Sequence, residues 1–139
     1  MKIRQDFVSN SSSTSFVVSM KEDFTLENFK KTLGITQNNL LAGIVKDIFG
    51  VINSKKRDVK DIVEKYPKFY NDPIDVFEEY CYDSDSLELV KKLLKDNRKV
   101  YVGSFADQGW DNPIELYLCF SKILISNEDI YLESLREYY

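Results

Sequence analysis

The sequence predicts a single compact α+β domain, spanning residues 1–139, in which four to six helices pack with a small sheet. Its 139 residues are the length of one domain, and no repeat or long linker divides them. Hydrophobic residues make up 43% of the chain, which is too many for a disordered protein. Helical periodicity fills the middle of the chain, whereas β-rich segments lie near its start and after residue 99.

The chain begins with two extended segments, Lys2–Val8 and Ser15–Met20, on either side of the polar stretch Ser9–Thr14. Both segments contain aromatic and β-branched residues, and the stretch between them has the composition of a turn. This arrangement predicts an N-terminal hairpin.

The next segment carries clear signals for a helix. Thr25 is a suitable N-cap, and Phe24 and Phe29 occupy the two positions of a hydrophobic staple around it. Gly34 provides the C-terminal stop.

A second helix is predicted with Thr36 as its cap and with Ile35 and Leu40 as its staple pair. Its apolar residues follow a helical spacing over a wide stripe, which predicts the central buried helix of the domain. The stripe consists of Leu40, Leu41, Ile44, Val45, Ile48, Phe49 and Ile52.

Three short helices follow. The first covers Asp58–Tyr66 and ends before Pro67, and the second has Pro73 in its first turn. The third has Asp85 as its cap, with Glu88 three residues later.

The last part of the chain alternates strands and helices. Val100–Phe105 and Lys122–Ser126 have the composition of strands, and Asn112–Pro113 between them has the pattern of a helix start. Asn127 is expected to cap a terminal helix that runs to Tyr139.

Composition excludes several kinds of chemistry. The chain contains no histidine, so a Ser-His-Asp triad, a Cys-His pair and a His-ligated zinc site cannot form within it. Cys81 and Cys119 are too far apart for a CxxC motif, and we expect both to be small buried hydrophobes. We expect no cofactor.

The expected location is cytoplasmic, with no membrane partner. The N-terminus lacks the apolar middle of a signal peptide. No apolar stretch approaches the roughly 18 residues that a membrane span needs. The net charge of −4 argues against broad direct binding to nucleic acid.

Charge is distributed unevenly along the chain. Between Phe69 and Val90 there are seven acidic residues and no lysine or arginine, and basic clusters lie on both sides. Two interpretations stay open: ordinary solvated helix faces, or an acidic surface that occupies a positively charged groove on a partner.

Aromatic residues accompany these acids. Core packing accounts for many such side chains, but tyrosines with an acidic rim are also typical of interfaces. Tyr66, Phe69, Tyr70, Phe77, Tyr80 and Tyr82 form the aromatic set. The candidate partner-binding residues are Asp72, Asp75, Glu78, Glu79, Tyr80, Tyr82, Asp83, Asp85 and Trp110.

A run of hydroxyl and amide side chains offers a candidate anion cradle or modification site. It comprises Ser9, Asn10, Ser11, Ser12 and Ser13. The glycines and the lysine of a phosphate-binding loop are missing from the run, so a solvated turn is the alternative.

A third candidate site consists of Asp107, Asp111 and Glu115, which follow a predicted strand. Acidic residues at the carboxyl end of a strand can hold Mg²⁺. The alternative is structural, because Asn112, Pro113 and Glu115 also suit the capped start of a helix.

The N-terminal stretch KIRQDFVSNSSSTSFV, residues 2–17, resembles the opening of many uncharacterised small proteins of bacteria, archaea and their phages. Their signature has the form KIRxGFVSNSSSSSFV, and Asp6 and Thr14 depart from it here. Val100–Phe105, with the acidic loop after it, is similar to a later segment of some of these proteins. The resemblance implies a phage or mobile-element setting and carries no catalytic residue.

Two functional hypotheses follow. The first is a non-catalytic acidic module that binds a protein with a basic surface, such as a nucleic-acid-handling enzyme of host defence, and inhibits it by occlusion in the manner of anti-CRISPR proteins. The alternative is a magnesium-dependent enzyme or a nucleotide or anion binder that uses Asp107, Asp111 and Glu115.

Overall fold

The computed structural model describes residues 13–37, 39–80, 84–106 and 112–135, and it has an α+β fold as predicted. The elements within these ranges are β1 (Ser13–Met20), α1 (Leu26–Thr32), α2 (Leu40–Lys55), β2 (Arg57–Asp58), α3 (Val59–Lys65), α4 (Pro73–Tyr80), α5 (Ser84–Lys95), β3 (Val100–Ala106), α6 (Pro113–Phe120), β4 (Leu124–Ser126) and β5 (Ile130–Leu135). None of these helices is both long and apolar enough to cross a membrane.

The strands form one antiparallel sheet in the order β2-β3-β1-β5-β4. β1 lies at its centre and pairs with β3 on one side and with β5 on the other. The predicted hairpin is therefore wrong for Ser15–Met20, because both edges of that segment are occupied by strands from the second half of the chain. Its expected partner, Lys2–Val8, lies outside the described residues.

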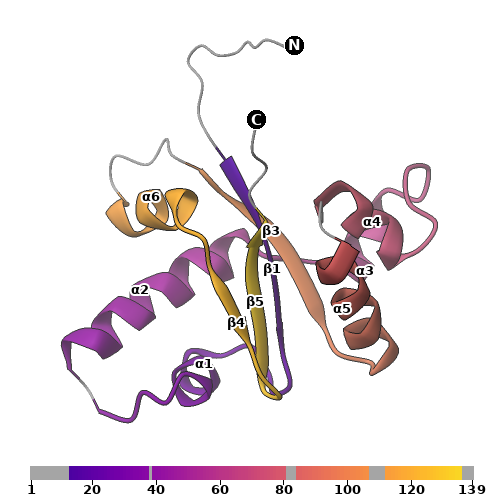
Figure 1. Cartoon of the computed structure of the whole chain (residues 1–139). Helices are drawn as coiled ribbons and strands as arrows, with labels where there is room; N and C mark the ends of the chain where they lie inside the picture. The colour runs from indigo at the N-terminus through magenta and orange to yellow at the C-terminus, as the bar shows by residue number, and fades with distance from the viewer. Residues whose placement is uncertain (1–12, 38, 81–83, 107–111, 136–139) are drawn as a thin grey trace, which may run out of the picture.

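Helices cover both faces of the sheet, which makes the fold three layers deep. α1, α2 and α6 lie on one face, and α3, α4 and α5 lie on the other (Figure 1). β1 serves both layers because side chains alternate along a strand. Phe16 and Val18 contribute to the core under α1 and α2, whereas Val17 contributes to the core under α3 and α5.

The first helix begins and ends as its sequence predicts. The Thr25 side chain accepts a hydrogen bond from the backbone N–H of Asn28 at 3.1 Å. The rings of Phe24 and Phe29 lie 5.9 Å apart, in the staple position. Gly34 adopts a φ of 75°, the left-handed conformation that closes many helices.

α2 begins later than its sequence predicts. Its N-cap is Asn39, whose side chain accepts from the backbone N–H of Ala42 at 3.1 Å, so the prediction that Thr36 caps this helix is wrong. The reason lies in the preceding helix: the backbone N–H of Ile35 donates to the carbonyl of Lys30 at 2.9 Å. That bond holds Ile35 in the end of α1.

α2 buries only one of its faces. Leu40 is 82% exposed, and Leu41 and Ile44 are exposed as well. The prediction of a central buried helix is therefore correct only for one face of α2, which carries the buried residues Ala42, Val45, Val51 and Ile52.

Local signals also fixed most of the other helix starts. Asn112 caps α6 through its side-chain oxygen, as the sequence predicts. Asp58, the first residue of the predicted helix Asp58–Tyr66, is the cap of α3. Pro73 opens α4. Asp85 is different: α5 already begins at Ser84, so Asp85 lies in its first turn and is not its cap.

The last described residues form a strand, β5, so the helix predicted after Asn127 is wrong over this range. Asn127 accepts hydrogen bonds from the backbone N–H groups of Asp129 and Ile130, which closes the tight turn between β4 and β5. The following residues, Ile130, Tyr131 and Leu132, are all buried. Such burial on both faces is typical of a strand inside a covered sheet.

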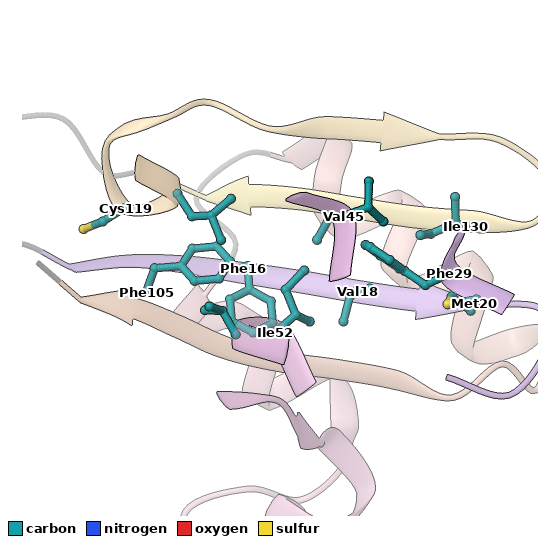
Figure 2. Close-up of a cluster of buried hydrophobic side chains, with 12 residues drawn as sticks. Phe16, Val18, Met20, Phe29, Val45, Ile52, Phe105, Cys119 and Ile130 are labelled. Atoms are coloured by element: carbon teal, nitrogen blue, oxygen red, sulfur yellow. The ribbon is translucent and has the colours of Figure 1, made fainter. Parts of the chain in front are cut away.

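Two residues of adjacent strands fix the packing at the centre of the sheet. Phe16 stacks on Phe105 with 4.5 Å between ring centroids, beneath Ile52 of α2 (Figure 2). Its ring also covers Gly103, the residue opposite it on β3. A Cβ atom at Gly103 would lie 2.5 Å from Cζ of Phe16 and 2.7 Å from the carbonyl oxygen of Lys55.

Gly103→Ala is therefore expected to lower the free energy of unfolding by about 1–3 kcal/mol, the usual cost of overpacking a core. Gly50→Ala is the matched control, since a Cβ there meets open space on α2. It should raise stability by about 0.5–1 kcal/mol, because alanine favours a helix over glycine. Urea denaturation measures both, and a Gly103→Ala protein as stable as the wild type would contradict this packing.

Candidate functional site

The start of α4 holds two of the predicted partner-binding carboxylates in fixed positions. Asp72 Oδ1 accepts from the backbone N–H groups of Ile74 and Asp75, at 2.9 and 3.3 Å. Asp75 Oδ2 accepts in return from those of Asn71 and Asp72, at 2.7 and 3.3 Å. This reciprocal pattern is a capping box, so both acids stabilise the helix start. Their negative charge stays at the surface, where it also complements the helix dipole.

Along α4 the apolar and acidic residues separate. Val76 and Phe77 are fully buried in the core, whereas Glu78 is exposed. No lysine or arginine among the described residues lies within 4 Å of the Glu78 carboxylate. The backbone of Glu79 and Tyr80 belongs to α4, but their side chains lie outside what the structure describes. Tyr82, Asp83 and Trp110 are wholly outside the described residues.

The two acids of α5 differ from those of α4. Asp85 is exposed in the first turn of the helix. Glu88 accepts from Lys91 Nζ at 3.2 Å, on the same helix face. The pair is an ordinary solvated contact and contributes little to stability.

The aromatic set divides between core and surface. Phe77 is fully buried and Tyr70 packs against the same core, as the core-packing interpretation expects. Phe69, in the turn between α3 and α4, is 77% exposed, and Tyr66 is also exposed. We call Phe69, Asp72, Asp75 and Glu78 the α4 surface: one exposed aromatic ring followed along the chain by three carboxylates.

The serine-rich run lies mostly outside the described residues. Ser9, Asn10, Ser11 and Ser12 fall there, and their predicted role in anion binding or modification stays a prediction. Ser13 is exposed and opens β1. The next residue, Thr14, is buried and donates to the carbonyl oxygen of Cys119 at 2.6 Å.

The structure gives the N-terminal signature a packing role. Its last five residues, Ser13–Val17, lie in the central strand, and the later similar segment, Val100–Phe105, lies in the strand beside it. Phe16 of the first segment covers Gly103 of the second and stacks on Phe105. The two segments of the resemblance therefore meet in one part of the core.

The candidate magnesium site is only partly described. Asp107 and Asp111 lie outside the described residues. Glu115 is buried, and its Oε2 atom accepts from the backbone N–H of Ala106 at 2.9 Å and lies 3.3 Å from Lys55 Nζ. It thus ties the start of α6 to the end of β3 and to α2. The described residues contain no group of three or more acids or cysteines placed to hold a metal ion.

The sequence reasoning missed an exposed apolar face on α6. Leu116, Tyr117 and Phe120 are exposed there, while Leu118 and Cys119 are buried. The signal was present: the helix PIELYLCF is apolar nearly all round, more than one buried stripe requires.

Comparison with known proteins adds no relative to this picture. No family model, curated protein or solved structure matches the chain. The functional argument therefore depends on the chain's own residues.

Because Glu115 joins three elements, we expect Glu115→Ala to lower the free energy of unfolding by about 1–3 kcal/mol. Glu88→Ala removes a carboxylate from an exposed ion pair and should change the free energy of unfolding by less than about 1 kcal/mol. Chemical denaturation of both variants measures the difference. Equal, small effects would show that the bond to Ala106 and the ion pair with Lys55 do not hold the elements together.

Proposed function

We propose that this protein is a non-catalytic binding module whose α4 surface occupies a basic surface on a protein partner. The observation that carries the proposal is Phe69, a large aromatic side chain that is 77% exposed and that precedes the carboxylates of Asp72, Asp75 and Glu78 along the chain. Large aromatic residues are enriched at the buried centres of interfaces. A solvent-exposed phenylalanine therefore supports a docking role.

The carboxylates supply charge in fixed places. The capping box holds Asp72 and Asp75 against the backbone, so their positions cost little side-chain entropy when a partner binds. Glu78 has no ion pair to give up within the described part of the chain. Complementary charge would steer a basic partner toward this surface and raise its rate of association.

A partner of this kind uses its basic surface to bind phosphate. Carboxylates that pair with its lysines and arginines would block that use by occlusion. In the phage or mobile-element setting that the N-terminal resemblance implies, the partner would be a nucleic-acid-handling enzyme of host defence, and the protein would act as its inhibitor.

We do not extend the proposal to a magnesium-dependent enzyme. Of the three residues on which that hypothesis depends, Glu115 is engaged by Ala106 and Lys55, and Asp107 and Asp111 lie outside the described residues. No described feature favours the hypothesis.

The test begins with affinity capture from a host lysate, followed by measurement of the affinity of the purified partner for variants of the chain. Phe69→Ala and Glu78→Lys should each weaken binding by about tenfold or more, as substitutions at an interface centre do. Added salt should weaken binding to the wild type, because exposed charges are screened.

Two controls match these variants. Leu40→Ala removes an exposed apolar side chain from α2, and Glu27→Lys reverses an exposed charge on α1, in the opposite helix layer. Both should bind as the wild type does. Capture of no stoichiometric partner, or equal affinities for the site variants and the controls, would overturn the proposal.

A further inference from the structure

The turn between β4 and β5 lies at one end of the sheet (Figure 1). A cleft of about 1050 Å³ is found at this turn. The loop after β1, the end of α5 and the start of β3 line it together with that turn. Its volume is in the range of small-molecule sites. The cleft is separate from the α4 surface, since the two share no residue.

Arg98 is the most unusual residue of this cleft. Among the described residues, its guanidinium donates to two main-chain carbonyls, those of Glu128 at 3.3 Å and Ser19 at 3.4 Å. Its Nε atom is buried and has no hydrogen-bond partner in the part of the chain that the structure describes. Within the described ranges, no carboxylate lies within 4 Å of it.

This environment is costly for a cation. Burial lowers the pKa of Arg98, although Asp96 and Asp129 oppose the shift from beyond ion-pair distance. A partly buried charge without a close counter-ion is unfavourable, and an anion that reaches the guanidinium would recover the lost interaction.

Further positive charge faces two aromatic rings on the same cleft. Lys56 Nζ lies 4.5 Å from the ring centroid of Tyr101 and 5.4 Å from that of Phe24. Lys56, Lys99 and Tyr101 also line a second cavity of about 440 Å³, so the two hollows adjoin. The aromatic rings provide a surface against which a planar group can pack, and the cations provide positive charge for an anion.

Acidic residues limit what can enter. The cleft is lined by Lys21, Lys56, Lys92, Arg98 and Lys99, and also by Glu22, Asp23, Asp96 and Glu128. Five cations against four acids leave a small positive excess in a chain whose net charge is −4. A long polyanion such as nucleic acid would meet the acids as well as the cations. A small ligand with one compact anionic group avoids that repulsion.

We propose that this cleft binds a small phosphorylated ligand that carries a planar ring. The phosphate contacts the guanidinium of Arg98, and Lys56 and Lys99 supply further positive charge. The planar group packs against Tyr101 and Phe24 at the same wall.

The test uses the full chain labelled with ¹⁵N and three probes: inorganic phosphate, adenosine monophosphate and adenosine. Phosphate and the nucleotide should shift the Nε–Hε resonance of Arg98 and the backbone resonances of Lys99 and Tyr101 in a saturable way. Adenosine, which lacks the phosphate, should bind at least about tenfold more weakly than the nucleotide, the loss expected for a charge-assisted hydrogen bond.

Charge-reversal variants distinguish a specific contact in the cleft from the effect of the protein's overall charge on nucleotide binding. Lys99→Glu should weaken nucleotide binding by about tenfold, whereas Lys46→Glu, on the exposed side of α2 and outside the cleft, should leave it unchanged. Equal weakening by both variants, or the absence of saturable shifts at Arg98 with phosphate and with the nucleotide, would overturn the proposal. Partner binding at the α4 surface is measured separately, so the two proposals can fail independently.

Discussion

The pairing of β1 on both of its edges is the constraint on which the rest of the structure depends. β1 is the strand that contacts both β3 and β5, and these two connect it to β2 and β4 at the edges of the sheet. Its side chains alternate between two cores, with Phe16 and Val18 under one helix layer and Val17 under the other. β1 therefore contributes side chains to the core beneath each helix layer, and this shared strand connects the two layers. Gly103 is required for the same reason, since β3 must pass directly beneath the ring of Phe16.

The sequence predictions were accurate where the interaction is local in sequence and wrong where it depends on contacts between distant segments. Thr25 and Asn112 were identified from the sequence as caps because a cap depends on backbone groups only a few residues away. Thr36 and Asn127 have the same chemistry but do not cap helices, because Ile35 is held by α1 and the residues after Asn127 complete the sheet. In both cases an interaction with another element of the fold prevents the residue from capping a helix, and a local sequence pattern does not contain that information.

The candidate sites show the same division. The acidic run was predicted to face solvent, and Asp72, Glu78 and Asp85 do so. The sequence did not show that Asp72 and Asp75 also cap a helix together. An acidic surface and a helix cap require the same residue type, so the sequence does not distinguish the two roles. The cleft around Arg98 was beyond prediction for another reason. Its lining comes from the loop after β1, the ends of α2 and α5, the start of β3 and the turn after β4, which only the folded chain brings together.

The central position of β1 has a consequence for how the chain acquires its structure. Thr14 hydrogen-bonds to Cys119 across 105 residues of sequence, and β5 follows later still. During synthesis, β1 emerges before the other described strands, and both of its edges can be filled only after nearly all the described elements have followed. Contacts of such long range slow folding, because the entropy of closing the loop is lost before the contact forms. Until then, the apolar side chains of β1 and its open hydrogen-bonding edges are available to other chains, so folding on the ribosome favours conditions in which nascent chains are kept apart.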